Sequence, residues 1–346
     1  MSRTVSFKCP ACGGYLEFDP DGQQFECRYC GHQINEEELQ KLSQEKEEAR
    51  GGAAAEGGFK SYHCQMCGAE IVTGDTTAAT RCYYCHQPVV LADRLDAEFR
   101  PDGVIPFRLD KKGAEDAFKK FVAKKTFIDK KFFSTAQLED FSGVYYPYWY
   151  GDVLGEAILQ GSGTRSSTET TSREYITRTR HYRLDLAGHI RYFPMVRKGL
   201  NAVDRTLSDG IHPYNLEEIK PFASGYLSGF LAERRDVEKE SAQTEMERDA
   251  RKYADDVMRD QVQFDQVSGD TSFNILHTDM RSLLLPAWVL TYKGKDGKEP
   301  YYYMMNGQTG EVCGKLPINK GKLYAWAAGI FAAVTGLLCL GGALLW

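Results

Sequence analysis

Eight of the ten cysteines in this 346-residue chain fall into two sets with the same spacing, C-x2-C-x14-C-x2-C. The first set is Cys9, Cys12, Cys27 and Cys30, and the second is Cys64, Cys67, Cys82 and Cys85. A two-residue gap lets a tight turn aim two thiolates at one ion, and a hairpin brings the second turn opposite the first. The pattern therefore predicts two zinc ribbons, each holding one structural Zn²⁺ through four sulfurs.

A fully thiolate-coordinated ion has no open position for water or substrate, so each site is expected to be structural rather than catalytic. A ribbon of this size buries too little apolar area to fold alone, and metal binding supplies the missing free energy. Glycine follows Cys12, Cys30 and Cys67, as suits a turn that needs positive φ.

The segment 323–346, LYAWAAGIFAAVTGLLCLGGALLW, contains no charged residue. A helix of this length reaches roughly 36 Å, enough to cross a hydrocarbon core of about 30 Å. Lys315, Lys320 and Lys322 lie just before it, and the positive-inside tendency places the preceding chain in the cytoplasm. We predict a single-pass transmembrane helix in the cytoplasmic membrane; the alternative is a buried core helix. Cytoplasmic thiols stay reduced, which favours metal ligation over disulfides.

The sequence predicts a multidomain chain. Its parts are zinc ribbon 1 (1–35), a charged helical spacer with a Gly/Ala linker (36–58), zinc ribbon 2 (59–90), an α+β domain with antiparallel strands (95–320) and the transmembrane helix (323–346). Residues 36–48 are polar all round and residues 49–58 read ARGGAAAEGG. We therefore expect a solvated spacer and a flexible joint, with the two ribbons as separate beads.

The central domain shows both helical and strand periodicity. Residues 111–132 predict a helix with an apolar face, and residues 143–200 alternate as strands do, around a polar loop or hairpin tip at 161–173. Residues 214–262 predict helical structure whose charged second part lies exposed. Strands resume at 263, with a hairpin turn at Lys-Asp-Gly 295–297.

Two short segments resemble each other. Tyr-Pro-Tyr-Trp (146–149) and Leu-Pro-Ala-Trp (285–288) each lie in a predicted strand before a glycine-bearing hairpin. Our hypothesis is an internal duplication of two β units, with chance similarity as its rival.

Charge bears on the class of partner. Residues 1–50 carry six Lys/Arg against ten Asp/Glu, and residues 59–100 carry four against five. A phosphate-binding surface should be clearly basic, so the ribbons favour protein partners over nucleic acid. The predicted helix carries Lys-Lys pairs across 111–131. These pairs leave three interpretations open: a solvated face, contact with anionic lipid, or contact with nucleic acid.

Catalytic motifs are absent from the sequence. It contains no phosphate-binding loop, dinucleotide fingerprint, H-E-x-x-H or G-x-S-x-G. We therefore do not expect an enzyme.

Four further segments carry a resemblance beyond the cysteines. They are VIPFRLDKKGAEDAFKKFV (104–122), GVYYPYWYGD (143–152), YNLEEIKPFASGYLSGFLAERRDV (214–237) and MNGQTGEVCGKLPINKGK (305–322). With the ribbons and the apolar tail, they resemble a bacterial family of membrane-anchored proteins with paired zinc ribbons of the transcription-factor-B type. The resemblance implies a role in envelope stress, with a stomatin-like (SPFH) scaffold and a phage-shock-type coat protein as partners. Only the zinc ligands carry over, onto the eight cysteines.

We therefore expect a membrane-anchored zinc-ribbon adaptor that recruits or organises proteins at the cytoplasmic membrane face. The alternative is a membrane-tethered nucleic-acid-binding protein that uses the ribbons and the Lys-rich helix 111–131. A third interpretation is a β domain that senses a ligand. Ala328, Ala332 and Gly336 form a small-residue stripe, through which the membrane helix could oligomerise.

Overall fold

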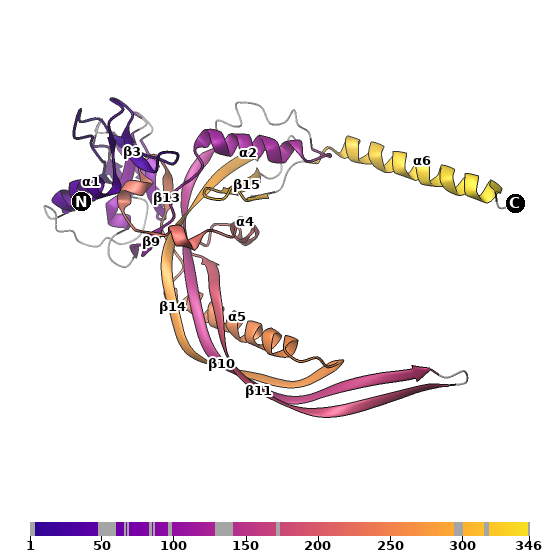
Figure 1. Ribbon diagram of the computed structural model, residues 1–346. Helices are drawn as coiled ribbons and strands as arrows, with labels where there is room; N and C mark the ends of the chain where they lie inside the picture. Colours follow the sequence, from indigo (N-terminus) through magenta and orange to yellow (C-terminus); the bar gives the residue numbers. More distant parts are fainter. Residues whose placement is uncertain are drawn as a thin grey trace.

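The computed structural model describes residues 4–47, 60–65, 67, 69–82, 85, 87–95, 99–128, 141–170, 174–293, 300–314 and 318–344. Three parts of the chain stand out in Figure 1: a head built from the two cysteine-rich ribbons, a body, and a long β arm that curves away from both. The C-terminal helix α6 (Lys320–Leu344) leaves the body separately.

The head consists of short antiparallel strands and one helix. Ribbon 1 contains β1 (Thr4–Val5), β2 (Leu16–Asp19), β3 (Gln24–Cys27), β4 (Gln33–Ile34) and helix α1 (Glu36–Glu47). Ribbon 2 contains β5 (Lys60–His63), β6 (Glu70–Thr73), β7 (Thr77–Arg81), β8 (Pro88–Leu91) and the 3₁₀ turn η1 (Ala92–Arg94). A turn at 19–22 joins β2 to β3, which pair antiparallel.

The two ribbons form one packed unit, so the expectation of separate beads was wrong. Strand β1 of ribbon 1 pairs antiparallel with β8 of ribbon 2, with Val5 opposite Val90. The Thr4 hydroxyl donates to the carbonyl of His63 (3.1 Å). These segments are far apart in the sequence, so no local sequence pattern could predict their backbone pairing. The Gly/Ala part of the linker lies outside the described residues.

Helix α1 forms where the spacer was expected, but it is not a solvated element. Asn35 and Glu38 form a reciprocal cap: the Glu38 N–H donates to Asn35 Oδ1 (2.9 Å) and the Asn35 N–H donates to Glu38 Oε2 (3.2 Å). Leu39 is fully buried and packs so closely on Gly225 that a Cβ added there would lie 2.0 Å from Leu39 Cδ2. One leucine on a polar helix thus docks α1 onto the body.

The body is a mixed sheet, which corrects the expectation of antiparallel strands. At its centre β10 (Ser142–Thr170) pairs antiparallel with β14 (Gln266–Lys293). Two short strands run parallel to their neighbours: β13 (Leu231–Glu233) beside β10, and β9 (Gly103–Val104) beside β14. β15 (Pro300–Asn306) and β16 (Val312–Gly314) complete one edge. The predicted hairpin turn at 295–297 lies outside the described residues.

The sheet continues from the head into the body. Its strand order is β1-β8-β7-β13-β10-β14-β15-β16. Because β13 pairs with both β7 and β10, ribbon 2 is joined to the body by main-chain hydrogen bonds. Head and body therefore share one sheet.

Helix α2 (Lys111–Ala123) confirms the predicted amphipathic helix, although it ends earlier than expected. The Asp110 side chain caps it by accepting from the Gly113 N–H (2.6 Å). Ala114, Phe118 and Val122 are buried, as the spacing of the apolar residues predicted.

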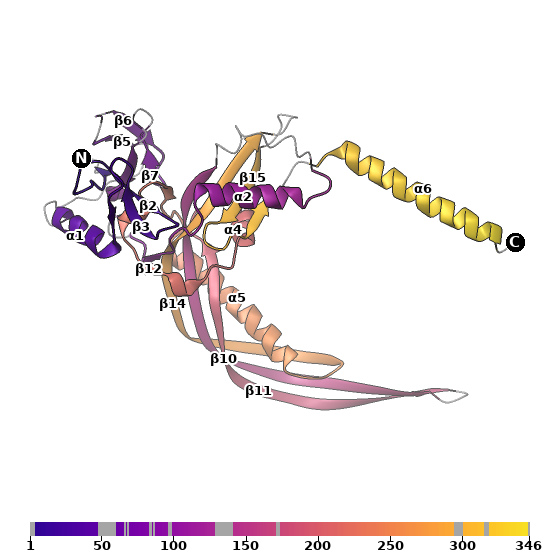
Figure 2. The same cartoon turned by 45° about the horizontal axis from the view of Figure 1, so that its top comes forward.

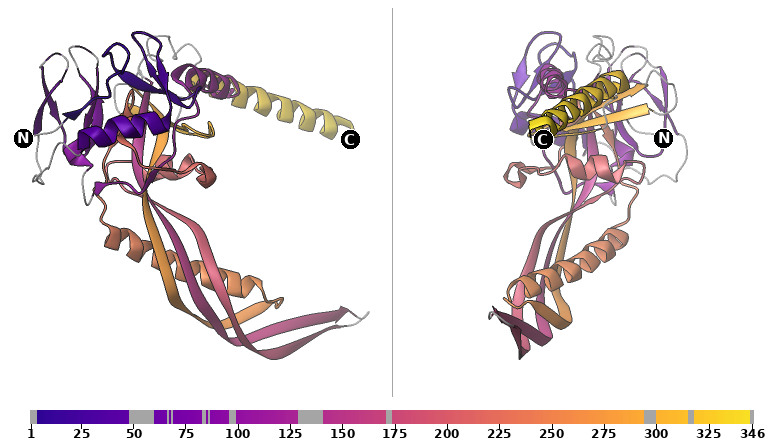
Figure 3. Two further views of the ribbon diagram at one scale, coloured as in Figure 1. Left: turned by 60° about the vertical axis from the view of Figure 1, so that its left-hand side comes forward. Right: turned by 90° about the vertical axis from the view of Figure 1, so that its right-hand side faces the viewer.

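The arm consists of the distal parts of β10, β14 and β11 (Tyr175–Lys198), covered on one face by helix α5 (Lys239–Asp260) (Figure 3). Strands continue through 161–170, where the sequence predicted a polar loop or hairpin tip, and β10 and β11 form a hairpin there. The charged run forms a helix, as predicted, but its predicted exposure was wrong. Helix α5 buries Ala242, Met246, Ala250, Ala254 and Met258 against the arm. Alanines at helical spacing form this narrow stripe, and counting only large apolar residues misses it.

Most of the segment 214–237 is not helical, contrary to prediction. Besides β13 it contains η4 (Leu216–Glu218), β12 (Lys220–Pro221) and η5 (Ser224–Leu227), and α4 (Arg205–Gly210) lies just before it. Apolar residues are buried here in single turns rather than along a helix face.

The two segments of the duplication hypothesis lie side by side. In the antiparallel pairing of β10 and β14, Tyr146 is opposite Leu285. The indole N–H groups of Trp149 and Trp288 each donate to a backbone carbonyl, of Val237 and Leu109 respectively, both at 3.0 Å. The shared origin of the segments stays a hypothesis.

We expect the Leu39→Ala variant to lose about 2–5 kcal/mol of stability, because truncation leaves a cavity between α1 and the body. Denaturant unfolding of the detergent-solubilised chain measures the change. Leu276→Ala is the control, since that side chain is 53% exposed, and it should change stability by less than about 0.5 kcal/mol. Equal effects of the two changes would contradict the burial of α1.

Candidate metal centres and the adjoining cleft

The four sulfurs of ribbon 1 form a compact cluster. Cys9 Sγ lies 3.8 Å from Cys30 Sγ, and Cys12 Sγ lies 3.6 Å from Cys27 Sγ. All four lie within 4.8 Å of one another. A tetrahedral ion with metal–sulfur bonds of about 2.3 Å places its sulfurs about 3.8 Å apart. A disulfide needs about 2.05 Å, so the cluster has the dimensions of a metal site.

Ribbon 2 has the same arrangement. Cys64 Sγ lies 3.6 Å from Cys85 Sγ, and Cys67 Sγ lies 3.7 Å from Cys82 Sγ. The structure thus brings all eight predicted cysteines together in two quartets, each consistent with one metal ion.

Backbone turns position the sulfurs of ribbon 1. Gly13 and Gly31, which follow ligand positions, have φ of +74° and +70°, as predicted from sequence. The Gly13 N–H donates to the Cys9 carbonyl (2.9 Å), which closes the first turn, and the Gly14 N–H donates to Cys12 Sγ (3.4 Å). Gly68, the corresponding residue of ribbon 2, lies outside the described residues.

The electrostatics of ribbon 1 favour a bound cation. Burial raises the pKa of the Cys27 thiol, but the backbone N–H groups of Cys30 and Tyr29 outweigh it and lower that pKa to about 7. The Gly14 N–H lowers the pKa of Cys12, but the adjacent thiols of Cys30, Cys27 and Cys9 raise it to about 12. Four adjacent sulfurs therefore cannot all be thiolates without a positive charge between them, which a divalent ion supplies.

Burial divides each quartet in the same way. Cys9 and Cys27 are buried in ribbon 1, as are Cys64 and Cys82 in ribbon 2, while the other cysteine of each turn is exposed. Since four protein sulfurs complete a tetrahedron, the arrangement suits a structural ion. Cys313 is remote from both quartets, on β16, with Sγ 3.4 Å from the Thr206 carbonyl.

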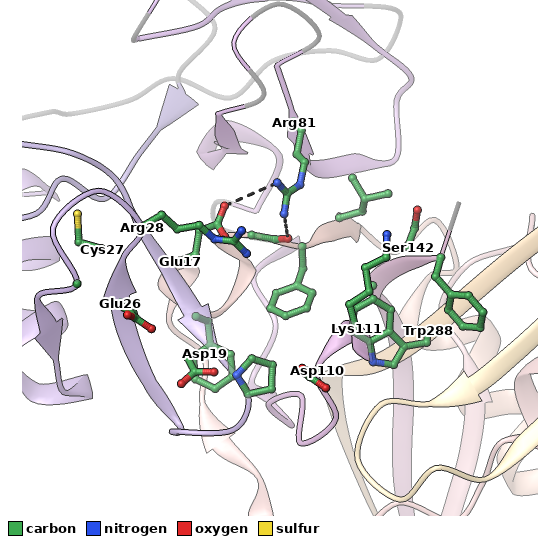
Figure 4. A pocket seen from close by; sticks show the side chains of 18 residues that line it. Glu17, Asp19, Glu26, Cys27, Arg28, Arg81, Asp110, Lys111, Ser142 and Trp288 are labelled. Carbon is green, nitrogen blue, oxygen red and sulfur yellow. Dashed lines mark hydrogen bonds and ion pairs between the residues drawn. The ribbon is translucent and has the colours of Figure 1, made fainter. Parts of the chain in front are cut away.

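A cleft of about 860 Å³ adjoins the first quartet, where both ribbons meet the body (Figure 4). Glu17 lies on its wall with its side chain only 6% exposed. Arg28 Nε is 2.5 Å from Glu17 Oε2, and Arg81 Nη1 is 3.7 Å from Glu17 Oε1. Arg81 also donates to the Gly229 carbonyl (2.6 Å). The buried Glu17 carboxylate thus pairs ribbon 1 with ribbon 2, and Arg81 extends the network to the body.

The opposite wall of the cleft belongs to the body. Asp110 and Lys111 lie at the start of α2, beside Ser142 and Trp288 (Figure 4). Basic and acidic side chains are mixed around the cleft, which suits a junction between parts of the protein. Sequence reasoning missed it because its residues come from distant segments and share no motif.

We expect two zinc ions per chain, measured by elemental analysis of the purified protein. Cys27→Ser should lose one ion, and Cys82→Ser should lose the other, because each removes a buried ligand from a four-sulfur site. Cys313→Ser is the control and should keep both. Two zinc ions retained in Cys27→Ser would contradict the first site.

Comparisons with known proteins give the chain a relative. No family model matches it, and no solved structure matches it. It is 32% identical over 333 residues to the uncharacterized protein YdjG of Bacillus subtilis (strain 168), and the match covers 94% of each chain. A match of this identity over nearly the whole of both chains shows common descent: the chain belongs to the family of YdjG.

Proposed function

We propose that this protein is a membrane-anchored adaptor whose head recruits partner proteins at the cytoplasmic face of the membrane. The observation that carries the proposal is a contrast between the two ends of the protein. The head is joined to the body through one sheet, whereas α6 is long, apolar and exposed over the whole of its best candidate span, Lys320–Leu338.

The proposed anchor is α6. Its exposed side chains include Phe331, Leu337 and Leu338, which are 70–74% exposed. Among the described residues, contacts with the body are found at the start of α6. The N–H of the preceding residue, Asn319, donates to the Phe127 carbonyl (2.7 Å), and Trp326 packs on the Phe127 ring. Bare apolar surface of this extent needs a nonpolar surrounding, and a bilayer provides one. Lys320 and Lys322 at the start of α6 favour a cytoplasmic position for the body.

The proposed function of the two metal ions, which we assign as zinc, is structural. They hold the head in shape so that it can serve as a binding surface. Charge favours protein partners over nucleic acid, because the ribbons carry more acidic than basic residues. Lys119 on α2, moreover, has acidic neighbours: its Nζ lies 3.4 Å from Asp116 and 4.0 Å from Glu115.

The proposed partners follow from the family resemblance of the sequence. They are a stomatin-like (SPFH) scaffold and a phage-shock-type coat protein, in a response to envelope stress. The stripe Ala328, Ala332 and Gly336 on α6 supports a further proposal, that the membrane helix packs against another helix.

We expect membrane attachment to depend on the apolar face of α6. The wild-type chain should stay in the membrane pellet after alkaline carbonate extraction. The double variant Val334→Lys/Leu338→Lys should be released, because each lysine at the centre of a span costs about 2.5–3.5 kcal/mol. The volume-conserving pair Val334→Ile/Leu338→Met is the control. Release of the wild-type chain would contradict the anchor.

Partner capture should depend on the metal centres and not on nucleic acid. We would purify the full chain from detergent-solubilised native membranes, with and without nuclease, and identify co-purifying proteins by mass spectrometry. A stoichiometric partner should survive nuclease and about 0.5 M salt, which screens surface charges.

The variants separate the two candidate functions. Cys64→Ser/Cys67→Ser should lose the partner, whereas replacing Lys119, Lys120, Lys124 and Lys125 with glutamine should keep it. Recovery only of nucleic-acid-bound proteins, lost with nuclease or with those four lysines, would contradict the adaptor and favour nucleic-acid binding.

A further inference from the structure

The far end of the arm is a two-stranded ribbon, and contacts from the segment before β14 reach it only at Arg165 and Ser166 among the described residues. Pairing of β14 with β10 ends at Gln266 opposite Thr164, whereas β10 and β11 continue to pair as far as Thr170 opposite Tyr175. We call residues 165–170 and 175–180 the ribbon tip. A two-stranded ribbon is at best marginally stable in water by itself, so this extension gains little for the fold.

Polar groups on one face hold the ribbon tip together. The hydroxyls of Ser166 and Thr179 lie 3.0 Å apart, and those of Thr168 and Thr177 lie 3.1 Å apart. Cross-strand hydroxyl pairs stabilise a ribbon that has no core. The tip is therefore a shaped element rather than an unstructured loop.

Positive charge is concentrated around this tip. The segment 161–183 contains five arginines and two glutamates, a net charge of +3 in a chain whose net charge is −5. Glu169 lies 3.7 Å from Arg178 and offsets it in part. For Arg180 and Arg183, the described part of the chain shows no ion pair. A basic element on an acidic protein indicates an anionic surface as its target.

The ribbon tip also exposes apolar side chains next to its arginines. Tyr175 is 79% exposed and Ile176 is 37% exposed. Tyrosine beside arginine is the composition that favours the interface of a membrane, where the ring reaches the headgroup level and the guanidinium meets phosphate.

The arm and α6 project from the same side of the body. In Figures 1 and 2 both the ribbon tip and the free end of α6 point away from the head. The arm and α6 therefore extend from the body in the same general direction.

We propose that the ribbon tip of the arm binds the anionic headgroups of the membrane that α6 enters, as a second point of attachment. The proposal rests on the proposed anchoring by α6. Because arginine is costly in hydrocarbon, the tip stops at the headgroups. Two separated attachments then fix the angle at which body and head stand above the bilayer.

The test uses the full chain in lipid nanodiscs, with an environment-sensitive fluorescent amino acid in place of Tyr175. One set of discs is phosphatidylcholine, and the other contains about 30% phosphatidylglycerol, which supplies the negative surface potential. We expect a blue shift, with quenching by brominated lipid, only in the anionic discs. The same label in place of Tyr29, which is 87% exposed on the head, should show neither effect.

Charge variants identify the element responsible. Arg178→Gln/Arg180→Gln/Arg183→Gln should abolish the shift, since each arginine removed weakens surface binding roughly fivefold. Lys112→Gln/Lys120→Gln/Lys124→Gln is the matched control. It removes the same charge from α2 and should keep the shift. Loss of the shift only in the lysine variant would overturn the proposal.

The remaining outcomes separate this proposal from the anchoring by α6. A chain that never enters discs contradicts the anchor and overturns the proposal with it. A chain that enters both kinds of disc, with identical spectra at position 175, overturns the ribbon-tip proposal alone. A shift produced by duplex DNA but not by anionic lipid would also overturn it, in favour of nucleic acid.

Discussion

The head depends on one constraint: in each of its two ribbons, four cysteine sulfurs must lie around a single point. Each ribbon has only short strands, and β1 and β4 have two residues each. Such elements bury too little apolar surface to offset the entropy of ordering the chain. A metal ion, with which each quartet is consistent, would supply the difference, since its apparent binding free energy is about 10–16 kcal/mol in small zinc domains. Without the ions, we expect the ribbons to unfold and the head to lose its surfaces.

The consequences extend beyond the ribbons because the head is part of the main sheet. Ribbon 1 packs its aromatic residues on the body, where Phe18 and Phe25 meet Tyr226 at ring distances of 5.2 and 5.6 Å. The Ser228 hydroxyl donates to the Leu16 carbonyl (2.5 Å), and the Phe18 N–H donates to the Ser228 carbonyl (3.1 Å). Under our proposal, metal binding in the head organises the surface from which β13 enters the body. The proposed adaptor would then present its partner site at a fixed angle to its anchor.

Features set by residues that are neighbours in the chain could be predicted from the sequence, whereas features set by pairing between distant segments could not. The two cysteine quartets, α2 and α6 follow from spacing and composition, because turns and helices are set by neighbours in the chain. The pairing of β1 with β8 and the buried carboxylate of Glu17 depend on segments far apart in sequence, so no window reveals them. The two parallel strand pairs could not be predicted either, because β9 and β13 are only two and three residues long.

Helix α5 and the arm show a different limit. The run 239–260 is dominated by charge, and its buried stripe consists of three alanines and two methionines. Met246 fits because Gly151 of β10 lies directly beneath: a Cβ there would approach Met246 Sδ to 2.4 Å. Packing between a glycine and a methionine has no sequence signature. A highly charged helix that packs on a sheet cannot be told from a fully solvated helix until the sheet is known.

Hydrogen exchange of the zinc-loaded full chain, compared with its Cys9→Ser/Cys12→Ser variant, tests the central claim that metal binding orders the head and its junction with the body. Our account predicts faster exchange throughout ribbon 1 and also in β8 and η5, which contact it across the head and at the body. Faster exchange confined to residues 4–34, with β8 and η5 unchanged, would contradict it. The ribbons would then be independent beads, and a head that works as one unit could not be maintained.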